Sequence, residues 1–233
     1  MSLQKGDFIL IDYNAKTKET GETFDTTNEG TAKTAHLHKE GETYEPKLVV
    51  VGEGWMLKPI DEAFPTMEPN KSATVEIPSE KAFGPRDPEK IKRVSLKQLY
   101  AKGIERPAIG ARIEYGGKMA TIRSIGAGRV LLDFNAPLAG RTLIYEITIQ
   151  KKLETNDDKM IALIHRRIPI ADQTKFRLAA EPNTLTIEMP EETFYLEGIQ
   201  VAKRGVAMDI QKFFPETTAV KFVEIHKTEP AKP

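Results

Sequence analysis

Apolar and polar residues alternate along the first part of the chain with the period of two that is typical of β-strands. Ile9, Ile11, Tyr13 and Ala15 fall on one face of a predicted strand over residues 7–16. Other short apolar or β-branched runs end at Gly or Pro and predict further strands. These runs cover residues 47–51, 72–77, 142–150, 160–168, 184–189 and 219–226, with a three-stranded meander over 112–134.

Helical spacing appears in three places. Met56, Ile60 and Phe64 share one side of a predicted helix, in which Pro59 is acceptable only within the first turn. A short helix is expected between Ser95 and Gly103, and a long one over residues 191–214. Residues 26–46 are polar and predict a loop or a short bulged strand. Strands and helices in separate runs indicate an α+β protein.

Composition removes several kinds of chemistry. The chain has 233 residues, 39% of them hydrophobic, and no Cys, which excludes disulfides, a thiolate nucleophile and Cys-ligated metal sites. His36 and His38 alone make a weak metal site, so we expect no metal and no cofactor. We find no membrane-length apolar run and no secretory signal near the N-terminus, and expect a cytoplasmic protein without a membrane partner.

Charge is unevenly placed although the chain as a whole is neutral, with 34 Lys and Arg against 34 Asp and Glu. Residues 85–135 carry 11 Lys and Arg against 5 Asp and Glu, a net charge of +6. The plain interpretation is a solvated basic surface. Nucleic-acid binding is disfavoured, because the basic residues are spread out and only Tyr100 and Tyr115 offer side chains for base stacking.

Five motifs occur in a characteristic order. They are Tyr13 at the end of the first strand, Glu22-Thr23-Phe24-Asp25, residues 52–64 (GEGWMLKPIDEAF), Ala82-Phe83-Gly84-Pro85, and residues 135–140 (NAPLAG). Their order and spacing resemble the FKBP family of peptidyl-prolyl cis/trans isomerases. The resemblance is to the SlyD-like branch with a domain inserted in the flap, and within it to the long archaeal members with an extra C-terminal domain.

The resemblance implies an FKBP-like antiparallel sheet wrapped on a short helix, interrupted by a small, mostly-β insert in the flap. Residues 1–84 and 136–153 would form the isomerase domain, and residues 85–135 a chaperone-like insert. Residues 154–233 would form a separate α+β C-terminal domain of unknown role. The C-terminal helix could support a homodimer or simply pack within its own domain.

The resemblance also implies an apolar pocket. Its residues would be Tyr13, Phe24 and Asp25 on one wall, Met56 and Leu57 at the rim, Ile60 at the floor, Ala82 and Phe83 on the far wall, and Leu138 and Tyr145 at the back. Apolar residues of the insert would contact unfolded chains; they are Ile104, Ile109, Ile113, Tyr115, Met119 and Ile122. The implied partners are unfolded or partly folded, proline-containing polypeptides.

Plainer interpretations remain for several of these residues. Asp25 follows a turn and could be an ordinary turn carboxylate. Met56, Leu57 and Ile60 could be plain helix core. The sequence departs from the family pattern with Ile60 in place of Trp, Phe83 in place of Tyr and Ala136 in place of His. An alternative function is therefore a non-catalytic holdase on the same scaffold.

Overall fold

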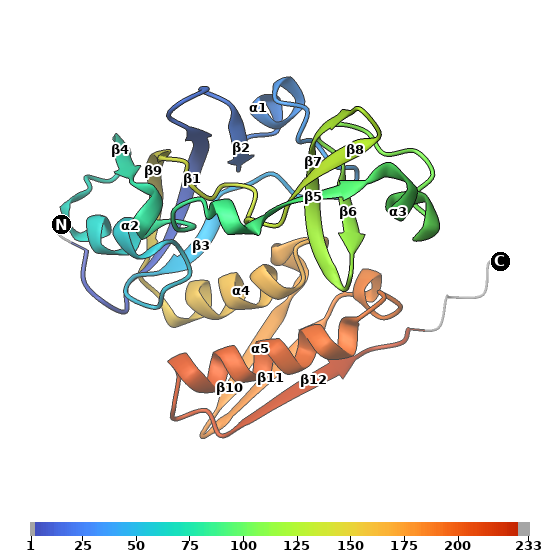
Figure 1. The fold of residues 1–233 in the computed structure, drawn as a ribbon. Helices are drawn as coiled ribbons and strands as arrows, with labels where there is room; N and C mark the ends of the chain where they lie inside the picture. Colours follow the sequence, from blue (N-terminus) through green and yellow to red (C-terminus); the bar gives the residue numbers. More distant parts are fainter. Residues whose placement is uncertain (1–2, 228–233) are drawn as a thin grey trace. The chain divides into compact units, whose positions relative to one another are not determined.

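The computed structural model describes residues 3–227, and its α+β class is the one that the sequence predicts (Figure 1). The described residues form two compact units. The first unit holds residues 3–15, 23–75 and 145–227, and the second unit holds residues 16–22 and 76–144. The three-domain division of the chain remains a prediction. No helix in the described range is long and apolar enough to cross a membrane.

The largest sheet has the strand order β2-β1-β9-β4, with β3 also paired to β1. Its strands are β1 (Phe8–Thr17), β2 (Thr23–Thr26), β3 (Lys47–Val50), β4 (Ser72–Ile77) and β9 (Leu143–Leu153). The alternation predicted for the first strand is confirmed, because Ile9, Ile11 and Ala15 are fully buried and Tyr13 nearly so. Leu10 lies between two of these residues and packs against a different apolar cluster. Strand β1 therefore contributes side chains to packing on both faces of the sheet.

Two short helices interrupt the strands of this sheet. Helix α1 (Glu29–Thr34) lies where we predicted a loop or a bulged strand, so that prediction is wrong. The Asn28 side chain caps this helix by accepting a hydrogen bond from Thr31 N at 2.9 Å, a capping signal that the polar composition conceals. Helix α2 (Lys58–Ala63) confirms the helix predicted from the spacing of Met56, Ile60 and Phe64, and Pro59 lies in its first turn.

The predicted insert forms a four-stranded sheet of order β5-β8-β7-β6. Its elements are β5 (Ile91–Ser95), α3 (Leu96–Ala101), β6 (Arg112–Tyr115), β7 (Lys118–Gly126) and β8 (Arg129–Asp133). The meander and the Ser95-capped helix are confirmed, whereas β5 is an additional strand. Gly116 and Gly117 both have positive φ, 63° and 74°, as a two-residue hairpin turn requires.

Asp133 organises the end of the insert, within the second unit. Its carboxylate is 1% exposed and accepts hydrogen bonds from Arg86 at 2.5 Å, Arg123 at 2.9 Å and the Asn135 side chain at 2.8 Å. Burial works against the ionised form, but these hydrogen bonds and the charge of Arg86 outweigh it and lower the pKa of Asp133. The carboxylate thus ties the chain entering the insert to the chain leaving it.

The C-terminal part of the first unit contains two helices and a three-stranded sheet. Its elements are α4 (Asn156–Arg167), β10 (Arg177–Glu181), β11 (Thr184–Met189), α5 (Ile199–Phe213) and β12 (Ala219–Glu224). Strand β11 pairs antiparallel with β10 and parallel with β12, and α5 is the connection between the parallel pair. Figure 1 shows α4 and α5 beside each other.

Two predictions fail in this region. The strand predicted over residues 160–168 is wrong, since residues 160–167 belong to helix α4, which Thr155 caps and in which Met160, Leu163 and Ile164 share the buried side. The helix predicted from residue 191 begins only at Ile199, since Gly198 adopts a left-handed conformation (φ 77°) in front of it.

One apolar cluster joins this C-terminal part to the first sheet. Phe8 and Val50 of the first sheet belong to the same buried cluster as Ile164, Ile187 and Phe214. Residues 154–227 therefore share a core with β1 and β3.

Candidate active site

Three aromatic side chains converge from three neighbouring strands of the first unit. The Tyr13 ring (β1) lies 5.8 Å from the Tyr145 ring (β9), and the Phe24 ring (β2) meets Tyr145 edge-on at 6.0 Å. Both tyrosines are buried and Phe24 is half-buried. We call Tyr13, Phe24 and Tyr145 the aromatic cluster. The structure thus brings together three of the residues that the resemblance places in one pocket, and their role in that pocket remains a prediction.

A carboxylate and an ammonium group attach to this cluster through Tyr13. The Tyr13 hydroxyl donates a hydrogen bond to Asp25 Oδ2 at 2.7 Å. Lys47 Nζ donates to the Tyr13 hydroxyl oxygen at 3.0 Å and lies 5.3 Å from the centre of the Tyr13 ring. Sequence reasoning missed Lys47, because nothing in its local sequence distinguishes it from a surface lysine at the start of a strand.

The two tyrosines of the cluster are held in their neutral forms. Burial, together with the hydrogen bond to Asp25 and its negative charge, raises the pKa of Tyr13 far above its usual range. Burial and the charge of Asp25 raise the pKa of Tyr145 to about 12. At neutral pH both tyrosines therefore keep their hydroxyl protons.

Helix α2 and the loop before it carry the residues predicted as the floor and the rim. Ile60 is fully buried, whereas Met56 and Leu57 are half-buried. The Asp61 carboxylate accepts hydrogen bonds from Gly52 N at 2.8 Å and Gly54 N at 3.0 Å, and so fixes the loop that leads to Met56. This burial is compatible with both the plain core interpretation and the pocket interpretation of Ile60.

Three predicted wall residues lie in the second unit. Phe83 is 46% exposed, and Ala82 and Leu138 are half-buried. A hydrogen bond from Gly140 N to Gly84 O, 2.8 Å long, brings the segments of Phe83 and Leu138 together within that unit. The places of Ala82, Phe83 and Leu138 in a common pocket remain predictions.

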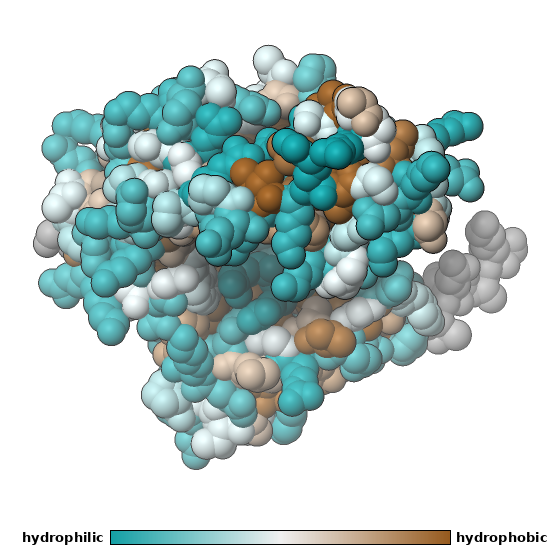
Figure 2. Space-filling view, viewed as in Figure 1, coloured by the Kyte–Doolittle hydropathy of each residue, from teal (hydrophilic) through white to brown (hydrophobic). Residues whose placement is uncertain are grey.

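The candidate contact residues of the insert fall into three groups by exposure. Ile109 and Met119 are 67% and 48% exposed, and Figure 2 shows hydrophobic residues at the surface over β5 to β8. Ile122, in contrast, is fully buried with Leu99 and Val130, so its prediction as an exposed contact residue is wrong. Ile104, Ile113 and Tyr115 pack partly against the same core.

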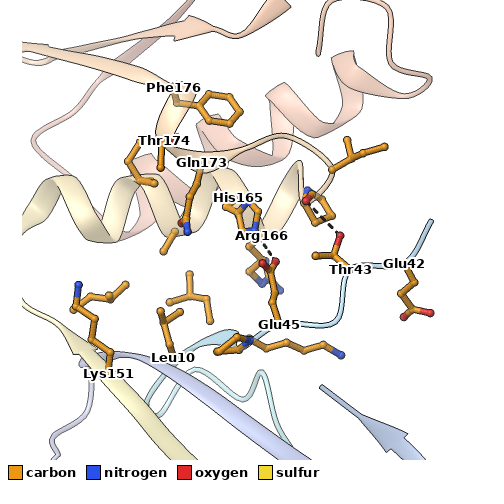
Figure 3. Close-up of a pocket in the computed structure, with 18 of the residues that line it drawn as sticks. Leu10, Glu42, Thr43, Glu45, Lys151, His165, Arg166, Gln173, Thr174 and Phe176 are labelled. Atoms are coloured by element: carbon orange, nitrogen blue, oxygen red, sulfur yellow. Dashed lines mark hydrogen bonds and ion pairs between the residues drawn. The ribbon is translucent and has the colours of Figure 1, made fainter. Parts of the chain in front are cut away.

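A cavity of about 1110 Å³ also lies in the first unit, and sequence reasoning did not find it (Figure 3). It is lined by residues 39–48, the end of β9, α4 and the segment 169–176. His165 Nε2 lies 2.5 Å from Glu45 Oε1 across it, and the Thr43 hydroxyl donates to Pro169 O at 3.4 Å. None of the predicted site residues lines this cavity.

Comparisons with known proteins find related sequences for both ends of the chain. The family of FKBP-type peptidyl-prolyl cis-trans isomerases matches residues 1–99, and the family described as FKBP26_C-terminal matches residues 156–227. The chain is 33% identical over 148 residues to the short-type peptidyl-prolyl cis-trans isomerase of Methanocaldococcus jannaschii, covering 64% of this chain and 92% of that protein.

Two bacterial proteins are also similar. The FKBP-type isomerase SlyD of Treponema pallidum is 27% identical over 122 residues, covering 50% of this chain and 68% of its own length. The FKBP-type 16 kDa isomerase of Escherichia coli K12 is 24% identical over 153 residues, covering 64% and 92%. On these matches, the chain belongs to the FKBP-type peptidyl-prolyl cis-trans isomerases.

Proposed function

We propose that the chain isomerises X-Pro bonds at the aromatic cluster, with Asp25 at its edge and Ile60 as its floor. The enzyme class predicted from the motifs is confirmed by the family match, and the location of the site is our proposal. The observation that carries it is the convergence of three rings from adjacent strands around the hydrogen-bonded pair Tyr13 and Asp25.

An apolar enclosure of this kind accelerates the reaction without covalent chemistry. The barrier to rotation, about 18–20 kcal/mol, reflects the loss of amide resonance when the peptide bond twists. The planar amide is more dipolar than the twisted amide, so water stabilises the planar form. Replacing water by the rings of Phe24 and Tyr145 raises the planar ground state relative to the twisted state. A pocket shaped for the twisted prolyl ring adds further selective binding.

Asp25 supplies directional polarity at the edge of this enclosure. Its Oδ2 atom is held by the neutral Tyr13 hydroxyl, which is itself contacted by Lys47. A carboxylate oriented in this way can interact with the prolyl carbonyl or amide as the bond rotates. The hydrogen bond from Tyr13 thus fixes the position of the Asp25 carboxylate while both tyrosines stay neutral.

Removing the Tyr13 hydroxyl tests this assignment. We expect Tyr13→Phe to lower kcat/KM for a short prolyl peptide about three- to tenfold, because Asp25 loses a charge-assisted hydrogen bond. The measurement is cis/trans exchange of the peptide with wild type and variant.

Tyr44→Phe is the matched control, since the Tyr44 hydroxyl contacts Lys39 N and Leu37 O away from the cluster. A rate for Tyr13→Phe equal to that of the control would contradict the role given to the Tyr13 hydroxyl. Absence of catalysis by wild type would favour the holdase alternative.

We propose that the natural substrates are unfolded or partly folded polypeptides that the insert holds near the catalytic site. Ile109 and Met119 are exposed on the insert and are the side chains that we expect to contact apolar segments of a client. Two tethered weak sites raise the effective concentration of a prolyl segment at the pocket. A cytoplasmic location remains a prediction from the sequence.

We also propose a homodimer through the C-terminal domain. Val201 and Met208 are 77% and 61% exposed and are seven positions apart, so they lie on one side of α5. An apolar stripe of this kind suits a self-association surface. Sedimentation equilibrium of the full chain is expected to give twice the mass of one chain, and a single-chain mass at all concentrations would contradict the proposal.

A further inference from the structure

The loop between β3 and α2, residues 52–57, carries the proposed rim residues Met56 and Leu57. Its two glycines, Gly52 and Gly54, have φ values of 83° and 67° and give this segment an intrinsically large conformational freedom. Asp61 restrains the start of the loop through the two backbone hydrogen bonds described above. We call residues 52–57 the rim loop.

The helices of the C-terminal part also contact this loop. The guanidinium carbon of Arg166 (α4) lies 3.9 Å from the centre of the Trp55 ring, and the Phe213 ring (α5) meets Trp55 edge-on at 5.8 Å. Lys212 of α5 forms an ion pair with Glu53. Three side chains of α4 and α5 thus contact Glu53 and Trp55 in the segment that leads to Met56.

The contacting groups are themselves held in place. Arg166 Nη1 lies 3.5 Å from Asp209 Oδ2, and Arg167 binds the same carboxylate in a bidentate manner at 2.7 and 2.9 Å. Phe213 packs edge-on against Phe8 of β1 at 5.2 Å. Arg166 and Phe213 therefore present Trp55 with a preformed slot of one cation and one ring edge, both favourable partners of an indole.

Trp55 lies at the margin of the buried cluster of the first unit. It packs against that cluster but is only half-buried, whereas cluster members such as Val50 and Leu163 are fully buried. Its ring thus connects the glycine-containing loop to two helices from a distant part of the chain.

We propose that Arg166 and Phe213 are positioning residues for the isomerase site, and that they act through Trp55 to hold Met56 and Leu57 in the arrangement that receives the substrate peptide. The inference rests on the proposed function, since it takes these two residues as the rim of the catalytic pocket. It gives residues 154–227 a direct role in substrate affinity. A rim fixed in advance loses little conformational entropy when the peptide binds, so this device acts on KM and leaves kcat unchanged.

The test uses the full chain, a prolyl tetrapeptide and the fluorescence of Trp55, which is the single Trp of the sequence. We expect Arg166→Gln and Phe213→Leu each to raise KM about three- to tenfold, with kcat within about twofold of wild type. The emission of Trp55 is expected to change in both variants. Phe213→Tyr keeps the ring and is expected to restore the wild-type KM.

Arg177→Gln is the matched control, because Arg177 is 78% exposed in β10 and lies outside the slot. The Arg166→Gln variant is expected to remain folded, because Asp209 keeps both hydrogen bonds from Arg167. An unchanged KM in Arg166→Gln with an altered Trp55 emission overturns the inference, and so does a fall in kcat at constant KM. A wild-type chain that does not catalyse peptide exchange overturns the proposed function itself, which separates the two failures.

Discussion

Replacing Phe24 by Ala is expected to reduce kcat/KM for a prolyl tetrapeptide about 10- to 100-fold, equivalent to about 1.4–2.8 kcal/mol of transition-state stabilisation. The ring is one side of the aromatic cluster and meets Tyr145 at 6.0 Å. Its removal admits water to the space in which the twisted amide is favoured over the planar one. The measurement is the catalysed exchange rate of the peptide by NMR.

Stability and catalysis can be separated in this variant. Phe24 is half-buried, so its loss is expected to cost about 1 kcal/mol of unfolding free energy, too little to unfold the chain. Tyr195→Ala is the control, because this substitution removes a ring of similar size at a position that is 89% exposed. Equal rates for Phe24→Ala and Tyr195→Ala would show that the reaction takes place away from the aromatic cluster.

Replacing residues 86–134 by a short flap is expected to lower the acceleration of a proline-limited protein refolding reaction about 100-fold or more, because the tethered capture site is lost. Turnover of a tetrapeptide, which is too short to use both sites, is expected to persist. The comparison of the two substrates in one preparation is the measurement.

A finer variant tests the same claim without removing the insert. Ile109→Ser combined with Met119→Ser changes two exposed side chains and leaves the buried insert core of Leu99, Ile122 and Val130 intact. Ile225→Ser, at a 46% exposed position outside the insert, is the control. If neither the double variant nor the flap replacement changed the refolding rate, the insert would have no role in capturing the substrate.

The sequence predicts those parts of the fold in which the signal is local. The period-two face of β1 and the double-glycine turn before β7 each depend on a few consecutive residues, and both are confirmed. Helix α4 was mistaken for a strand, although the cap at Thr155 and the spacing of Met160, Leu163 and Ile164 were legible. Strand β5 was missed because its pairing with β8 comes from a distant part of the chain.

Some residues of the candidate site could be proposed from the sequence, and others became visible only in the folded chain. Tyr13, Phe24, Asp25 and Tyr145 were proposed from a family pattern, and the structure brings them together. Lys47 was not proposed, since only the folded chain places its ammonium group on Tyr13. Ile122 was misassigned because the candidate contact residues were chosen for being apolar, without regard to the alternation along β7. In that strand Ala120 and Ile122 face inward, whereas Met119 faces solvent. The contact of Arg166 with Trp55 likewise has no local signal.

The placement of the catalytic site at the aromatic cluster is tested most directly by an NMR titration of the full chain with a prolyl tetrapeptide. Cis/trans exchange of the peptide is measured in the same sample. We predict accelerated exchange, with shift changes concentrated at Phe24, Asp25, Leu57 and the Ile60 methyl groups. Accelerated exchange with shift changes confined to the cavity beside α4, for example at Ile161 and Ile170, would contradict the placement of the catalytic site at the aromatic cluster.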